Sequence, residues 1–150
     1  GIKTIQPVAE TEGVSSFITE ITDRIPYFET LALLKKADVL FVPGSTDTGY
    51  TASKIYPYIL AEKPMLACFH KNSSVIAILR ESKAGQVVAF DHAHDSTDIL
   101  VHKVHQKICY LLKHKNEQFP YDVKGFQPYT AETMTGKLAE VFNRIVSRIS

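Results

Sequence analysis

The sequence predicts an α/β fold, a Rossmann-like three-layer sandwich in which helices cover both faces of a parallel sheet. Three apolar runs, at residues 38–43, 64–69 and 86–90, are typical of strands that are buried on both faces. Segments with helical spacing separate these runs, and this alternation indicates a parallel sheet with right-handed crossovers. Residues 1–150 fit a single domain of ordinary size.

The other elements follow from caps, turns and periodicity. Residues 3–12 leave open either a helix that starts at Pro7 or irregular chain. Residues 15–21 contain β-branched and aromatic side chains and predict a further strand, followed by a turn. Helices are predicted at 27–37, at 51–62 after a Thr51 cap, at 72–82 after Asn72 or Ser73, from Asp95 or Ser96 to about Lys115, and from about Thr130. Pro57 lies awkwardly inside the second of these helices.

Composition excludes several classes of protein. The formal net charge of +1 provides no basic field for a nucleic-acid partner. No apolar run approaches the roughly 20 residues of a membrane-spanning helix, and residues 1–20 lack the pattern of a signal peptide. Cys68 and Cys109 lie in a predicted strand and a predicted helix, so we expect reduced, buried thiols rather than a disulfide. A cytoplasmic location follows as an expectation.

The loop at residues 44–50 is the first candidate site. It follows the carboxyl end of a predicted strand, where parallel sheets bind ligands, and leads to a predicted helix start that attracts phosphate. Gly44 and Gly49 permit close backbone approach, and Lys54 offers a positive charge. Hydroxyl donors to phosphate or sugar oxygens are Ser45, Thr46, Thr48, Thr51 and Ser53. Ordinary helix capping beside a solvated lysine is the competing interpretation, and the residues alone leave both open.

The run from Ala37 to Leu66 resembles part of a known enzyme family. Its features are Ala37-Asp38 before a strand, Pro43 at the end of the strand, Ser53-Lys54 and Tyr58 in a helix, and Lys63-Pro64 before the next strand. They are similar to the donor-binding half of GT-B glycosyltransferases of the family 4 type. Residues 84–90 resemble the family's following strand, and the last helix resembles its C-terminal helix.

This resemblance implies a function and a set of site residues. The chain would be the C-terminal, nucleotide-sugar-binding domain of an enzyme that transfers a sugar from a nucleoside diphosphate sugar to a saccharide or lipid-linked acceptor in polysaccharide biosynthesis. No cofactor is implied. The implied donor-binding residues are Ser45, Thr46, Asp47, Thr48, Gly49, Tyr50, Thr51, Ser53 and Lys54. Arg24, Pro26 and Tyr27 would lie near the nucleotide base, the alternative being a Pro-initiated helix whose tyrosine packs on the core.

The chain also departs from the family pattern. The positions of the family's two glutamates fall on Gly49 and Pro57, so Asp47 is the candidate for the first role and Ser53 or Lys54 for part of the second. The family's first two strands in this half, which supply an arginine and a lysine, are not found. The resemblance therefore implies a domain that is truncated at its N-terminus and separated from the N-terminal acceptor-binding domain. Such a domain binds its donor without turning it over, and peripheral membrane association of the parent enzyme is compatible with this assignment.

Other functions find less support in the sequence. His92 and His94, and the helical pair His102 and His105, lack the three or four convergent ligands of a zinc site, so we expect no metal. Residues 69–74 contain a histidine near serines but no nucleophile-elbow motif. No phosphate-binding or dinucleotide-binding glycine motif occurs.

Two further alternatives stay open at this point. One is a non-catalytic α/β interaction or regulatory module that binds a protein or no ligand at all, and a flavodoxin-like receiver is one module of this class. Such a receiver carries an acidic cluster at the carboxyl ends of its strands, whereas Asp38 stands at the start of one. The other is a GT-B sugar-nucleotide epimerase, for which the sequence lacks the expected carboxylates.

Overall fold

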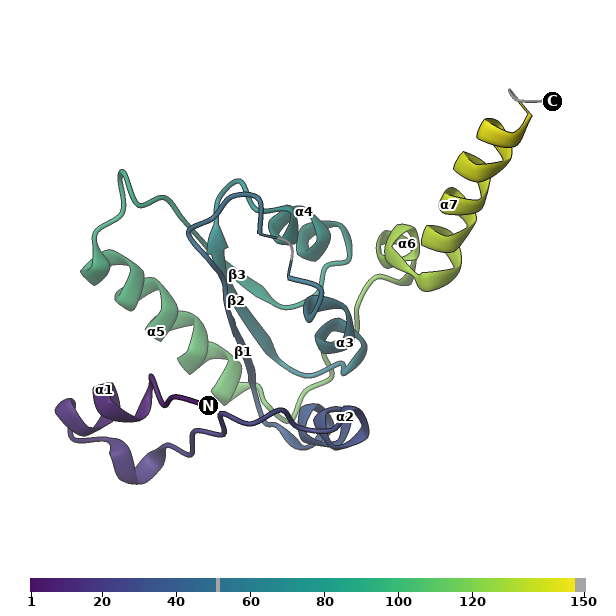
Figure 1. Cartoon of the computed structure of the whole chain (residues 1–150). Coiled ribbons are helices and arrows are strands. Elements are labelled where there is room, and N and C mark those ends of the chain that lie inside the picture. Colours follow the sequence, from purple (N-terminus) through teal and green to yellow (C-terminus); the bar gives the residue numbers. More distant parts are fainter. Residues whose placement is uncertain (51, 148–150) are drawn as a thin grey trace. The chain divides into compact units, whose positions relative to one another are not determined.

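The computed structural model describes residues 1–50 and 52–147, and they form two compact units, Gly1–Ala32 and Leu33–Ser150. The first unit contains α1 (Gln6–Thr11) and one turn of 3₁₀ helix, η1 (Ser15–Phe17). Helix α2 (Tyr27–Lys36) crosses the boundary between the units and confirms the helix predicted at 27–37. Figure 1 shows these elements along the chain.

The described residues of the second unit form a three-stranded parallel sheet. Its strands are β1 (Leu40–Pro43), β2 (Met65–His70) and β3 (Gln86–Phe90), in the order β1-β2-β3. These bounds match the three apolar runs, which confirms the α/β class and the parallel sheet. The order places β2 in the centre, and five residues in or next to it are almost fully buried, namely Pro64, Met65, Leu66, Ala67 and Phe69.

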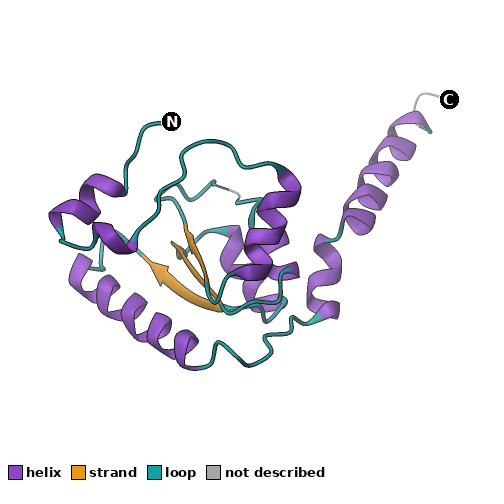
Figure 2. Cartoon of the chain, turned by 90° about the horizontal axis from the view of Figure 1, so that it is seen from below, coloured by secondary structure: helices purple, strands orange, loops and turns teal. Residues whose placement is uncertain are grey.

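Helices cover both faces of this sheet. Helix α5 (Thr97–Lys113) lies on one face, and α3 (Ile55–Leu60) and α4 (Ser74–Glu81) lie on the other (Figures 1 and 2). Ser73 caps α4 by accepting a hydrogen bond from the Val75 amide at 3.3 Å, and Ser96 caps α5 by accepting one from Ile99 at 3.4 Å. Both serines were among the predicted caps.

Side chains alternate along each strand, so one set of them packs on the face that α5 covers. Leu66 on β2 and Val88 on β3 pack with Leu111 of α5. Cys68 joins this cluster as a half-buried thiol, and burial raises its pKa. Both cysteines are free thiols, but Cys109 is exposed on α5, so the prediction that both are buried was wrong.

The C-terminal segment contains two short elements that the sequence did not predict. Helix α6 (Val123–Phe126) is capped by Asp122, which accepts hydrogen bonds from the amides of Lys124 and Gly125, and the 3₁₀ turn η2 (Gln127–Tyr129) follows it. Helix α7 (Ala131–Val146) begins after its Thr130 cap, as predicted, and none of its residues is buried. Within the described residues, we find no helix with the length and apolar character needed to cross a membrane.

The strand predicted at 15–21 does not form. Gly13 has a φ of +70° and ends α1, and Ser15–Phe17 then close into a 3₁₀ turn. The Glu20 carboxylate accepts hydrogen bonds from the amides of Thr4, Ile5 and Gln6, at 2.9, 3.1 and 2.8 Å. These contacts hold the segment around Glu20 against the start of α1. Residues 1–32 contain no strand with which this segment could pair.

The helix predicted at 51–62 begins later, at Ile55. Ala52 precedes it as a buried residue in irregular chain, and Ser53 and Lys54 form a turn. Pro57 is therefore the third residue of α3 rather than an interior residue. The first amides of a helix have no intrahelical partner, so proline costs no hydrogen bond there. Thr51, the predicted cap, lies outside the described residues.

Candidate functional site

The candidate site begins at Gly44, directly after β1. The Gly44 amide donates to the Cys68 carbonyl at 2.7 Å, which continues the ladder between β1 and β2. A Cβ atom at position 44 would collide with the Phe69 ring and would lie 2.8 Å from the Cys68 carbonyl oxygen. Only glycine lets the chain turn this closely over the end of the central strand.

The loop after Gly44 is held by its own polar groups. The Asp47 amide donates to the Ser45 hydroxyl at 3.1 Å, and the Gly49 amide donates to the Asp47 carboxylate at 2.9 Å. The Tyr50 amide donates to the Asp47 carbonyl at 3.2 Å. Part of the predicted donor-binding set, Ser45 and Asp47, therefore makes local turn hydrogen bonds, which neither the binding nor the helix-capping interpretation predicted.

The outer end of the loop is anchored by burial. Ala52 and Ile55 are 1% and 0% exposed, and the Ile55 amide donates to the Ala52 carbonyl at 2.9 Å. Since residues 52–54 are not helical and α3 begins at Ile55, the helix start predicted near Thr51 was wrong, and phosphate binding at this loop stays a prediction. Any anion at this loop would meet side chains and turn amides instead.

The structure keeps most of the predicted donor-binding side chains in contact with solvent. Ser45 is half-buried, and the exposed residues of the set are Thr46, Asp47, Thr48, Gly49, Tyr50, Ser53 and Lys54. Lys54 takes part in none of the ion pairs formed among the described residues. Its charge is thus uncompensated by a carboxylate and is available to an anionic ligand.

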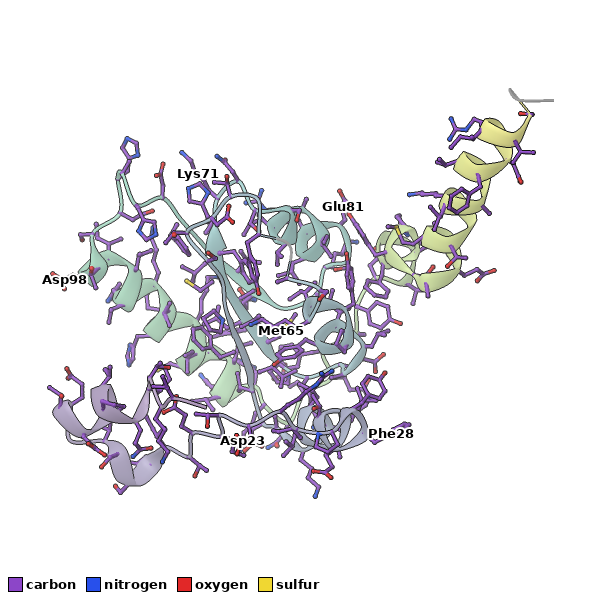
Figure 3. The ribbon with its side chains drawn as sticks, in the orientation of Figure 1. Asp23, Phe28, Met65, Lys71, Glu81 and Asp98 are labelled. Atoms are coloured by element: carbon purple, nitrogen blue, oxygen red, sulfur yellow. The ribbon has the colours of Figure 1, made fainter. Side chains whose placement is uncertain are left out.

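β2 and β3 end at the same edge of the sheet because they are parallel, so the segments that follow them begin there. Lys71 follows β2, and its Nζ atom lies 2.6 Å from Oδ2 of Asp91, which follows β3. The same carboxylate oxygen lies 3.0 Å from Nδ1 of His94. Figure 3 labels Lys71 at this edge. Hydrogen bonds from Lys71, the Ala93 amide and His94 hold the pKa of Asp91 well below its ordinary range.

A second ion pair extends this network. Asp95 accepts from the Asp91 amide at 2.8 Å through one oxygen and from Lys103 at 3.0 Å through the other. The hydrogen bond from Lys103 and that from the Asp91 amide lower the pKa of Asp95. The residue types alone did not reveal the Lys71–Asp91 pair, but strand register could have, because His70 and Phe90 are partners in adjacent strands.

The histidines near this edge have structural contacts. Nδ1 of His70 accepts from the Asn72 amide at 3.2 Å, and its ring packs edge-on against Phe90 with centroids 6.0 Å apart. His92 also packs against Phe90, at 4.9 Å. Among the described residues, no three histidine, cysteine or acidic side chains converge in a way that could hold a metal ion.

The predicted base-binding residues belong to the other unit. Arg24, Pro26 and Tyr27 are exposed residues of Gly1–Ala32, and their part in any site stays a prediction. Tyr27 is 68% exposed and contacts the Phe28 ring, so it does not pack in a core as the alternative held.

The arrangement as a whole offers polar recognition rather than covalent chemistry. A solvent-facing loop of hydroxyls and amides, with one unpaired lysine, adjoins a lysine–aspartate network at the carboxyl edge of a parallel sheet. Such a surface can bind a polar anion through hydrogen bonds and one positive charge.

Comparisons of the chain with protein-family models, curated proteins and solved structures find no match.

Proposed function

We propose that the unit Leu33–Ser150 is a nucleotide-sugar-binding domain of a GT-B-type glycosyltransferase, and that residues 44–54 hold the sugar diphosphate of the donor. The intact enzyme would transfer the sugar to a saccharide or lipid-linked acceptor in polysaccharide biosynthesis. Two independent lines support the proposal. One is the resemblance of residues 37–66 to the donor-binding half of the family, and the other is the placement of those residues in the fold.

The packing of Gly44 on Phe69 is the observation that carries the proposal. It brings the loop that begins at Ser45 close to the end of β2, and Thr46 and Thr48 of this loop are exposed at the carboxyl edge. Ligands of open α/β sheets bind at this edge.

Lys54 is the residue to which the proposal assigns charge neutralisation. The leaving diphosphate gains negative charge as the bond to the sugar breaks, and a fixed cation beside it lowers the barrier. Lys71 contributes less to this role because Asp91 already compensates its charge at 2.6 Å. Thr46, Thr48 and Ser53 would donate hydrogen bonds to phosphate or sugar oxygens.

Titration of the chain with UDP, GDP and ADP tests the proposal. We expect one nucleotide to bind, measured by calorimetry, and to shift backbone NMR signals of residues 44–54. Lys54→Ala should weaken that binding by about 10- to 100-fold, which corresponds to the roughly 1.5–3 kcal/mol of a hydrogen bond to a charged group. Lys137→Ala on the exposed helix α7 is the matched control and should leave binding unchanged.

Three results would contradict the proposal: no binding at millimolar nucleotide, a shift map that excludes residues 44–54, or equal losses in Lys54→Ala and Lys137→Ala. Circular dichroism of each variant confirms that the fold is retained before affinities are compared.

A non-catalytic interaction module is the second candidate, and α7 is the observation that favours it. Five side chains at heptad-like spacing along α7 are apolar and partly or largely exposed, namely Ala131, Met134, Leu138, Val141 and Ile145. Such a stripe is typical of a helix that packs against another surface. Substituting Leu138→Glu should abolish any concentration-dependent association seen by light scattering and leave nucleotide binding intact.

A further inference from the structure

A cavity of about 480 Å³ lies in the second unit, away from the loop described above. Side chains of α3, of the segment that follows α5, and of α6 and η2 form its walls, chiefly Tyr56, Leu60, Tyr121, Phe126, Gln127 and Tyr129. None of the described residues of the 44–54 loop lines it. Its volume is in the range of small-molecule sites.

Four aromatic rings give this cavity its character. Phe126 is 4% exposed and contacts the other three rings, with centroid distances of 5.2 Å to Tyr121, 6.3 Å to Tyr56 and 6.4 Å to Tyr129. The rings of Tyr56 and Tyr129 are 6.3 Å apart and tilted by 30°. The three tyrosines are only half-buried, so they present aromatic surface to a bound molecule. The buried Phe126 ring packs against all three.

The aromatic wall is fixed to the end of α4. The Asp122 amide donates to the Ser82 carbonyl at 2.7 Å, and the Tyr129 hydroxyl donates to Oε2 of Glu81 at 2.5 Å. Gly125 lies so close to the Glu81 backbone that a Cβ atom there would collide with it. Figure 3 labels Glu81 at the end of α4 that faces α6. The cavity is therefore built before any ligand arrives, which reduces the entropy cost of binding.

The electrostatics of the cavity favour a cation over an anion. No lysine, arginine or histidine is among the described residues that line it, and the aromatic faces carry partial negative charge. The Glu81 carboxylate accepts the hydrogen bond of the Tyr129 hydroxyl and so adds a negative charge next to this wall of the cavity. The same hydrogen bond raises the pKa of Tyr129 to about 12, so the phenol stays protonated. The nearby Lys83 is paired with Asp122 at 3.3 Å.

We propose that this cavity binds an organic cation with apolar substituents, of the alkylated ammonium class, through cation–π contacts with Tyr56, Tyr121 and Tyr129 and long-range attraction to Glu81. The mostly apolar lining suits the methyl groups of such a cation, and the aromatic faces suit its diffuse charge. A strongly hydrated primary ammonium would lose its water shell without recovering enough hydrogen bonds.

Choline and its neutral carbon isostere, 3,3-dimethyl-1-butanol, separate charge recognition from apolar binding. Each is titrated into the full chain, and binding is followed by the NMR signals of the tyrosine rings. We expect choline to bind at least several-fold more tightly than the isostere and to shift the signals of Tyr56, Tyr121 and Tyr129.

Two variants localise the effect. Glu81→Gln keeps a hydrogen-bond acceptor for Tyr129 and removes the charge, so choline should bind about two- to fivefold more weakly while the isostere is unaffected. Tyr56→Leu retains apolar volume but removes one ring, so it should also lower the affinity for choline by about two- to fivefold. Tyr110→Leu on α5, whose ring packs on His114 outside the cavity, is the control and should change neither affinity.

Equal affinity for choline and the isostere would overturn the proposal, because the cavity would then select apolar surface alone. Absence of choline binding at tens of millimolar, or shifts confined to other residues, would overturn it as well. If Tyr56→Leu proves unfolded by circular dichroism, Glu81→Gln decides the outcome. Nucleotide binding at the carboxyl edge is measured separately, so either proposal can fail without the other.

Discussion

Nζ of Lys71 lies 2.6 Å from Oδ2 of Asp91, and this ion pair joins the segment that follows β2 to the segment that follows β3. Because the pair holds the pKa of Asp91 below its ordinary value of 3.8, the folded state is favoured above that pH. The contribution is lost progressively as the pH falls below 3.8 toward the lowered pKa. We expect Asp91→Asn to be less stable than the wild type at pH 7, and the difference to narrow at pH 3.

Urea denaturation of both proteins at the two pH values measures this effect. Asp98→Asn is the matched control, since Asp98 is exposed in the first turn of α5 and in none of the ion pairs among the described residues. A stability difference for Asp91→Asn that does not change with pH would contradict the prediction.

Glu20 should make the stability of the first unit depend on pH in a similar way. Its hydrogen bonds from the amides of Thr4 and Gln6, with that of Ile5, lower its pKa from 4.5 to about 2. The stabilisation of α1 is therefore complete above pH 4.5 and is lost as the pH falls toward 2. The amide NMR signals of Thr4 and Gln6 should titrate with a midpoint near 2. In Glu20→Gln that titration should disappear, and persistence of the same midpoint would assign it to another group.

Gly44 and Gly49 should differ sharply when each is replaced by alanine. In Gly44→Ala the new methyl group collides with the Phe69 ring and the Cys68 carbonyl. The free energy of unfolding should therefore fall by about 1–3 kcal/mol, as in overpacked cores. In Gly49→Ala the nearest heavy atom is Oδ1 of Asp47 at 3.4 Å, and the stability should stay within about 0.5 kcal/mol. Chemical denaturation measures both, and equal effects would disprove the close contact at Gly44.

Leu111 and Leu112 are adjacent leucines with opposite environments. Leu111 is 0% exposed and packs with Leu66 and Val88, whereas Leu112 is 48% exposed. Leu111→Ala should lower the free energy of unfolding by about 2–5 kcal/mol through the lost contacts and the cavity left behind. Leu112→Ala on the same helix should cost less than about 1 kcal/mol. A reversed order would place the other face of α5 against the sheet.

The sequence predicted the second unit well because its strands are covered on both faces. Continuous apolar runs leave few alternatives, and strand bounds such as Gln86–Phe90 were correct. Serine caps were also readable, because Ser73 and Ser96 act on amides two or three residues away. Local signals sufficed wherever the structure itself is decided by local contacts.

Errors arose where distant contacts decide the structure. Residues 15–21 look like a strand, but Glu20 is held by amides at positions 4–6, about fifteen residues away. Ala52, just before α3, is buried outside the helix, and its small side chain does not reveal this in the sequence. At the candidate site the loop was found from its position after a strand. The Lys71–Asp91 pair was not found from the sequence, because it depends on the register between two strands.

The strand order β1-β2-β3 bears on how the chain reaches its fold. Leu40 pairs with Met65 and Leu66 pairs with Gln86, so each pairing closes a short stretch of chain. Parallel sheets usually fold slowly because their pairings are remote, and here the loop-closure entropy is close to the minimum that a parallel sheet permits. By the same reasoning we expect β3 to pair with β2 before β1 does, because positions 66 and 86 lie closer together in the chain than positions 40 and 65.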